Sequence, residues 1–148
     1  MGVSEAKMST GEIYSPHRIR HLSLPLAESL VAAGFPSPAD DYIAKDLDLN
    51  EYLVANPAAT FFVRVSGESM IDAGIHDGDL LVVDRSLEAS SGRIVIAVID
   101  GEMMVKRFCR LGGKVFLMAE SEEYPPLEIR RETDLVIWGV VTYVVHAL

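Results

Sequence analysis

The sequence has one cysteine, no long apolar run and a shortage of basic residues. The single cysteine, Cys109, excludes an internal disulfide and is typical of a protein kept in a reducing compartment. No apolar run reaches the length of a membrane span, and the first residues lack the apolar core of a signal peptide. A cytoplasmic location without a membrane partner is therefore expected.

Basic residues number 13 against 22 acidic ones, which gives a formal net charge of −9. Residues 1–33 add nothing to this charge, because they hold three acids and three bases: Glu5, Glu12, Glu28, Lys7, Arg18 and Arg20. Residues 34–148 carry all of it, and such an acidic body repels a phosphate backbone. Direct DNA binding is not expected.

The 148 residues, 49% of them hydrophobic, suffice for one packed domain with an arm. Six segments rich in Val, Ile and aromatic residues are separated by turn residues and predict strands: 60–65, 79–84, 93–99, 103–108, 114–119 and 134–145. Asp100-Gly101 predicts a hairpin turn. Strands do not alternate with helices, so a parallel sheet is not expected. The predicted fold class is mostly β, a compact antiparallel β domain with an extended N-terminal arm.

The segment before the first predicted strand has a different character. Residues 1–21 have weak periodicity and are expected to be flexible. Two prolines in the stretch GFPSP hold the following segment extended. Asp48 and Glu51 have the spacing of an N-cap and its capping-box partner, and Pro57 is expected to stop this short helix.

Ser69, in the connection SGESMIDAGIHDGD, is a candidate nucleophile. This connection is longer than a plain hairpin needs. Serines in glycine-rich turns commonly bond the local backbone, so Ser69 is either a turn residue or a nucleophile that needs a base. His76 lies in the same connection, but the expected state is that of a turn histidine exposed to solvent.

Lys106, in the segment EMMVKRFCR, is the candidate base. Strand alternation places Lys106 on one face with Met104 and Phe108. If that face is buried, desolvation lowers the pKa of the lysine, and the neutral amine can then accept a proton. The alternative is a lysine on an edge strand that points to water. Periodicity does not decide between the two, nor does it show that Ser69 and Lys106 meet.

Three aspartates in the same connection, Asp72, Asp77 and Asp79, resemble a metal cluster. Their spacing is not that of a calcium loop, and their glycine neighbours are typical of turns. Neither a metal nor another cofactor is expected.

The stretch SGESMIDAGIHDGDLLVVD followed by DGEMMVKR resembles the signature of the LexA/UmuD family of self-cleaving proteins. In that family the serine lies in an SG-x-SM pattern, and the lysine follows an Asp-Gly-Glu turn. The separation here, 106 − 69 = 37 residues, is the one that the family shows. The resemblance implies a serine endopeptidase that acts on its own chain, with Ser69 as nucleophile and Lys106 as general base. It also implies the C-terminal β domain of that family.

The resemblance covers about residues 24 to 148, including the ending WGVVTYVVHAL. It implies a scissile bond at Ala33–Gly34, where UmuD proteins commonly have Cys-Gly and LexA has Ala-Gly. Small residues let the backbone bend into a groove. The implied organisation is a flexible segment removed by self-cleavage (1–33), an extended arm with a short helix (34–59) and a β-rich Ser-Lys peptidase domain (60–148).

The resemblance further implies an SOS-response function. A RecA filament on single-stranded DNA would stimulate the cut, and the homodimeric product would join a UmuC-like subunit of a translesion, mutagenic DNA polymerase. Two alternatives are a non-catalytic UmuD-like binding module of a polymerase and a LexA-type repressor lacking its DNA-binding domain. Only 33 residues precede Gly34, fewer than a helix-turn-helix domain needs. Membrane-bound signal peptidases also use a Ser-Lys pair, but an apolar anchor is missing from this sequence.

Overall fold

The computed structural model describes residues 5–8, 11–14, 21–27, 31, 33–35 and 43–148. The chain divides into a larger unit, residues 1–18 with 56–148, and a smaller unit, residues 19–55. Each unit has its own sheet, and all strand pairs described are antiparallel. The prediction of a mostly β, antiparallel protein is confirmed.

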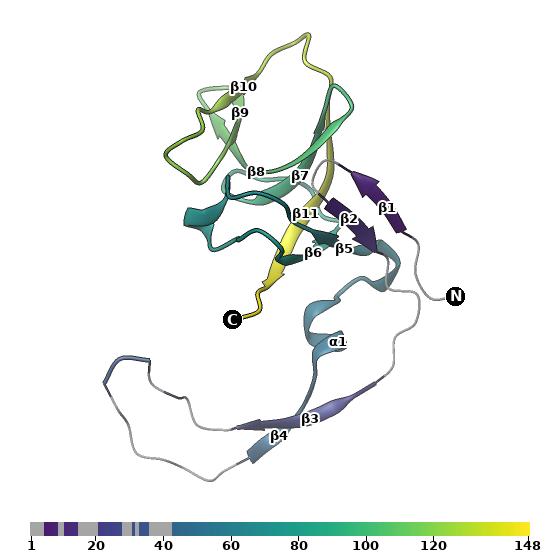
Figure 1. Cartoon of the computed structure of the whole chain (residues 1–148). Coiled ribbons are helices and arrows are strands. Elements are labelled where there is room, and N and C mark those ends of the chain that lie inside the picture. Colours follow the sequence, from purple (N-terminus) through teal and green to yellow (C-terminus); the bar gives the residue numbers. More distant parts are fainter. Residues whose placement is uncertain (1–4, 9–10, 15–20, 28–30, 32, 36–42) are drawn as a thin grey trace. The chain divides into compact units, whose positions relative to one another are not determined.

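The larger unit contains a nine-stranded sheet (Figure 1). In spatial order its strands are β1 (Glu5–Met8), β2 (Gly11–Tyr14), β5 (Thr60–Arg64), β6 (Leu80–Asp84), β11 (Leu135–Val145), β7 (Ile94–Ile99), β8 (Glu102–Leu111), β9 (Lys114–Met118) and β10 (Leu127–Ile129). The six strands predicted from residue 60 onward are all present. The sequence did not predict β10, nor the β1–β2 hairpin, which lies in a segment expected to be flexible and pairs through β2 with the edge of β5.

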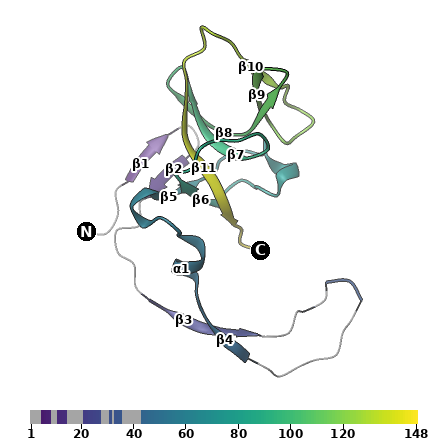
Figure 2. The same ribbon diagram turned by 180° about the vertical axis from the view of Figure 1, so that it is seen from behind.

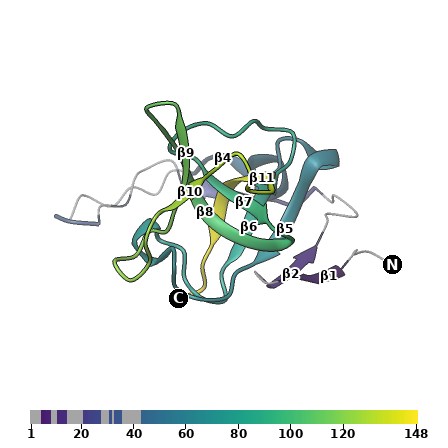
Figure 3. The same cartoon turned by 90° about the horizontal axis from the view of Figure 1, so that it is seen from above.

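Alternate residues of β7 enter two different hydrophobic clusters. Ile96 belongs to a first cluster with the buried residues of β5, β6 and the connection between them. Val95 and Ala97 belong to a second cluster with Phe108 of β8 and Leu117 of β9. Because both faces of β7 are covered, the strand is a continuous apolar run without alternation of polar residues. Figure 3 shows how β8 curves as it passes beside β7.

Two glycines meet local demands of this sheet. Asp100 and Gly101 join β7 to β8 with φ values of 49° and 83°, and two positive φ angles are the mark of a type I′ hairpin turn. Gly139 lies at a register shift of β11, where an added Cβ would sit 2.5 Å from Cγ1 of Val83. Gly139 therefore lets β11 run close to β6, as the rear view in Figure 2 also shows.

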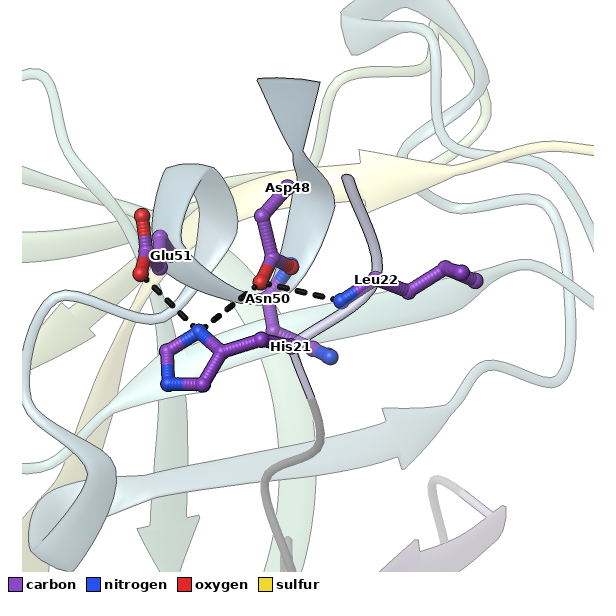
Figure 4. Close-up of polar contacts among 5 residues, drawn as sticks. All are labelled: His21, Leu22, Asp48, Asn50 and Glu51. Atoms are coloured by element: carbon purple, nitrogen blue, oxygen red, sulfur yellow. Dashed lines mark hydrogen bonds and ion pairs between the residues drawn. The ribbon is translucent and has the colours of Figure 1, made fainter. Parts of the chain in front are cut away.

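The smaller unit pairs β3 (Ser23–Ala27) with β4 (Ile43–Asp48), which leads into α1 (Leu49–Leu53). The Asp48 carboxylate accepts a hydrogen bond from the amide of Asn50 at 2.9 Å, so the predicted N-cap is confirmed (Figure 4). Glu51, the expected capping-box partner, instead lies 3.0 Å from Nδ1 of His21.

Pro57 does not stop α1, because the helix already ends at Leu53. The proline begins a separate 3₁₀ helix, η1 (Pro57–Ala59), where its fixed φ and missing N–H are tolerated. Among the described residues, no helix is long and apolar enough to span a membrane.

Candidate active site

Ser69 lies in the connection between β5 and β6, just before the 3₁₀ helix η2 (Ile71–Ala73). The next residue, Met70, is only 2% exposed and anchors the connection in the first hydrophobic cluster. The main chain of Glu120 holds the backbone from Ser69 to Asp72: its N–H donates to the Ser69 carbonyl at 2.8 Å, and its carbonyl accepts from the Asp72 N–H at 2.8 Å. These contacts fix the backbone that carries the Ser69 hydroxyl.

The two ends of the connection are hydrogen-bonded to each other. The amide of Val65 donates to the Asp79 carbonyl at 2.9 Å, and the amide of Gly78 donates to the Val65 carbonyl at 2.8 Å. The Asp77 carboxylate accepts from the amide of Gly67 at 2.7 Å, which is the turn role that the sequence predicted. These hydrogen bonds join the two ends of the connection and so restrain the loop that carries Ser69.

Lys106 points from β8 toward the serine. Its Nζ donates a hydrogen bond to Ser69 Oγ at 3.4 Å. Burial lowers the pKa of the lysine, since a charged ammonium loses hydration there. The ring of Tyr124, whose centroid is 5.4 Å from Nζ, favours the charged form, but the pKa is lowered all the same. Of the two orientations that periodicity left open, the half-buried one is found.

Both faces of β8 are covered, which explains why alternation alone could not place the lysine. Met103 and Val105 enter the first hydrophobic cluster, whereas Phe108 is buried in the second and Met104 packs against it. Lys106 shares its face with Met104 and Phe108, as predicted; Phe108 is buried there, whereas Met104 and Lys106 are partly exposed.

A small cleft lies beside the serine and has a volume of about 120 Å³. It is lined by Val65, Ser66, Gly67, Ser69, Met70, Met103, Met104 and Val105. Its wall combines polar surface with apolar side chains, and its small volume suits an extended peptide with small side chains.

The sequence did not predict an ion pair between Arg107 and Glu120, the residue whose main chain contacts the serine connection. Arg107, the neighbour of Lys106, donates from Nε to the Glu120 carboxylate, and its Nη1 donates to the Gly92 carbonyl at 2.5 Å. Glu120 therefore connects β8 through its side chain and the serine connection through its main chain. No sequence motif marks this pairing, because it depends on how the segment after β9 folds back.

Ala33 and Gly34, the expected scissile pair, lie in the smaller unit at a bend over residues 33–35. Both are exposed, and an ideal Cβ built on Gly34 would meet nothing within 4 Å. The backbone at this bond is therefore sterically open.

His76 differs from the expected solvent-exposed turn histidine. Its side chain is only partly exposed, its ring stacks on that of His146 with centroids 4.5 Å apart, and its Nδ1 atom is buried. Burial of Asp79 alone would raise the pKa of its carboxyl. Hydrogen bonds from the His76 amide and the His146 ring outweigh this effect, so the pKa of Asp79 is lowered.

Comparison of the sequence with known proteins assigns the chain to a family. The family model described as Peptidase S24-like matches residues 25–142. The chain belongs to the Peptidase S24-like family. The match includes both Ser69 and Lys106 as well as Ala33–Gly34, whereas the β1–β2 hairpin lies outside it.

Several curated proteins resemble this S24-like chain along most of its length. Protein MucA of Salmonella typhimurium is 50% identical over 122 residues, covering 82% of this chain and 83% of MucA. Protein ImpA of Escherichia coli is 50% identical over 123 residues, with the same coverage. The LexA repressor of Pseudomonas chlororaphis is 44% identical over 125 residues, which are 84% of this chain and 61% of the repressor. The resemblance to the LexA/UmuD family is confirmed, and the S24-like match supports a serine peptidase.

Proposed function

We propose that this chain is a self-cleaving serine endopeptidase of the SOS response, cut at Ala33–Gly34 to give a subunit of a translesion, mutagenic DNA polymerase. The observation that carries the proposal is the 3.4 Å approach of Lys106 Nζ to Ser69 Oγ beside a small cleft. Serine and lysine in hydrogen-bond reach are a known solution for activating a hydroxyl without histidine.

The reaction requires a neutral lysine. Protonated Lys106 can only donate to Ser69, whereas the neutral amine accepts the hydroxyl proton. The lowered pKa of Lys106 enlarges the neutral fraction near neutral pH, and the cause is burial within the fold. The lysine needs no further acid or base as a partner, since desolvation supplies the shift.

The proposed cleavage is an acyl transfer from the Ala33–Gly34 peptide bond to Ser69 and then to water. Ser69 Oγ attacks the carbonyl carbon of Ala33, and Lys106 takes the hydroxyl proton. The C–N bond to Gly34 then breaks, and the lysine returns the proton to the leaving amine. Water hydrolyses the resulting ester and releases residues 1–33 and 34–148 as separate chains.

The tetrahedral intermediate needs a hydrogen-bond donor for its oxyanion. The main-chain N–H of Ser69 is the simplest candidate, because it lies on the residue that makes the bond. Hydrogen bonds to Glu120 fix the backbone from Ser69 to Asp72 before substrate arrives. A donor held in this way stabilises developing charge without reorganising at the moment of reaction.

The proposed partners follow from the LexA/UmuD family. A RecA filament on single-stranded DNA stimulates the cut, and the cleaved homodimer binds a UmuC-like polymerase subunit. The acidic charge of residues 34–148 fits a protein that reaches DNA through such partners and not by itself.

The test is a cleavage assay with RecA, ATP and single-stranded DNA, read by intact mass. The proposal predicts fragments 1–33 and 34–148 from the wild type and none from Ser69→Ala. Ser90→Ala, at an exposed turn serine, is the matched control and should be cut normally. An uncut wild type that still binds a polymerase subunit would favour the non-catalytic binding module. Cutting of Ser69→Ala would refute the assigned nucleophile.

A further inference from the structure

Three potential metal ligands meet where β6 begins and β11 ends. His76 and Asp79 lie in the turn that leads into β6, and His146 directly follows β11. The antiparallel ladder pairs Val145 with Leu80, so the next pair outward brings His146 opposite Asp79. The ligand atoms of the three side chains all lie within 4.8 Å of one another.

The fold holds this group in place. Asp79 is only 3% exposed in its side chain, and its Oδ2 accepts a hydrogen bond from the His76 amide at 2.7 Å. The other oxygen, Oδ1, lies 2.5 Å from Nδ1 of His146. The Asp79 amide also donates to the His76 carbonyl at 3.1 Å. Two of the candidate ligands thus lie three residues apart on a hydrogen-bonded turn, and the third directly follows the central strand β11.

Asp79 accepts a hydrogen bond within its turn, but this structural role does not account for the environment of one atom of His76. Nδ1 of His76 is buried and has no hydrogen-bond partner among the described residues. Its nearest acidic atom, Asp79 Oδ2, is 3.7 Å away, beyond hydrogen-bond reach. A buried polar atom without a partner is costly, and a bond to a metal ion would satisfy it.

We propose that His76, Asp79 and His146 bind a divalent late transition-metal cation of the Zn²⁺ class. Two imidazoles and a carboxylate are a ligand set for Zn²⁺ or its neighbours, whereas Ca²⁺ and Mg²⁺ select all-oxygen sites. In a tetrahedral zinc site with bonds near 2.0–2.2 Å, ligand atoms lie roughly 3.3 Å apart. The separations of 2.5 Å and 3.7 Å lie on either side of this value. Small side-chain rotations close the site, and water takes the fourth position.

The chain contains a second cluster that serves as an internal comparison. His21, Asp48 and Glu51 also lie within 4.8 Å of one another (Figure 4). Only one imidazole is present there, and its Nδ1 already contacts both carboxylates, at 3.1 Å and 3.0 Å. Asp48 is further used as the N-cap of α1. This second cluster has no unpartnered buried nitrogen and is the weaker site.

Binding of a cation would restrain the connection that carries Ser69. The Asp79 carbonyl already accepts from the Val65 amide, four residues before Ser69. A cation shared with His146 would fasten the same turn to the end of β11. Metal binding by His76, Asp79 and His146 does not depend on whether the chain cleaves itself.

The test uses untagged full-length protein carrying Ser69→Ala, freed of metal and titrated with Zn²⁺ by calorimetry. The wild-type site should bind one equivalent. His76→Gln or His146→Gln should weaken binding by more than about 100-fold, since loss of even an outer-sphere partner costs 10- to 100-fold. His21→Gln and Cys109→Ser are the matched controls and should keep the wild-type affinity. Circular dichroism and metal-free melting temperatures show whether each variant is folded.

A second measurement needs no histidine variant. Co²⁺ should give the visible bands of a tetrahedral site without a thiolate charge-transfer band. Its paramagnetism should broaden the ring signals of His76 and His146 and leave those of His21 sharp. Equal Zn²⁺ affinity in wild type and His146→Gln, loss of binding in His21→Gln, or no binding by the wild type would each overturn the proposal.

Discussion

Lys106 Nζ lies 3.4 Å from Ser69 Oγ, although 37 residues separate the two along the chain. The lysine is placed by the β7–β8 hairpin, in which it pairs with Val95. The serine is placed by a connection whose backbone from Ser69 to Asp72 is hydrogen-bonded to the main chain of Glu120. The pair therefore depends on two supports that belong to different parts of the larger unit.

Replacing the lysine with a residue that keeps the charge tests its role as base. Lys106→Arg should reduce the rate of self-cleavage by about 10²- to 10⁴-fold, because arginine stays protonated and cannot accept the serine proton. Lys114→Arg, on an exposed lysine of β9, is the matched control and should cleave at the wild-type rate. Intact mass over a time course measures both. Robust cutting by Lys106→Arg would rule the lysine out as base.

The pH dependence of cleavage follows from the direction of the lysine shift. Burial lowers the pKa of Lys106, so the neutral, active form begins to accumulate at a pH below the ordinary titration of lysine. The rate of unstimulated cleavage should rise with pH through this lowered pKa and level off above it. Initial rates from about pH 7 to pH 10 measure the profile, and a flat profile would argue against a titrating lysine.

Local sequence signals predicted much of the sheet. The β-branched runs from residue 60 onward and the Asp100-Gly101 turn depend on neighbours along the chain, and all were found. The β1–β2 hairpin has only a weak pattern of its own and is paired with β5, a contact between distant segments. Propensity does not report such long-range pairing.

The candidate site was predictable only where a motif carries it. The family signature identified Ser69 and Lys106, and the structure brings them within hydrogen-bond distance. The contribution of Glu120 and the stacking of His146 on His76 depend on how distant strands and loops meet. His146 has no spacing relation to His76 in the sequence, because the β6–β11 ladder alone brings them together.

Glu120 should act as a positioning residue. Its carboxylate pairs with Arg107 while its main chain holds the serine connection, so Glu120→Gln weakens the link to β8. We expect cleavage to slow by about 10-fold, since misplacing a reacting group by a fraction of an ångström is costly. The midpoint of the pH profile should not move, as the lysine environment is kept.

The control for this prediction is Glu123→Gln, at an exposed glutamate of the same loop. It should leave both rate and pH profile unchanged. An equal loss of rate in the two variants would show that the loop responds to charge in general and not to the Arg107 pairing. A shifted pH midpoint in Glu120→Gln would show an effect on Lys106 itself.

Cleavage should uncover one edge of the larger sheet. β2 pairs with Phe62 and Val63 of β5, and Ile13 is buried in the first hydrophobic cluster. A cut at Ala33–Gly34 removes the covalent link between this hairpin and β5, so the hairpin can dissociate. The amides of β5 that face β2 should exchange hydrogen faster in the cleaved protein, because edge amides are open to water.

Hydrogen exchange with mass spectrometry compares intact Ser69→Ala protein with the isolated 34–148 product. Amides of β7, which is paired on both sides within the sheet, are the internal control and should be unchanged. Equal protection of β5 in both proteins would show that the hairpin does not cover this edge in solution.

Cleavage by Ser69 and Lys106 is best tested without a stimulating partner at about pH 10, where the neutral form of Lys106 is favoured. Purified wild-type protein and Ser69→Ala are incubated side by side, and intact masses are recorded. We expect a product that begins at Gly34 in the wild type and none in Ser69→Ala. An identical product in both proteins, or a wild type cut at another bond, would contradict the assignment of Ser69, Lys106 and the Ala33–Gly34 bond.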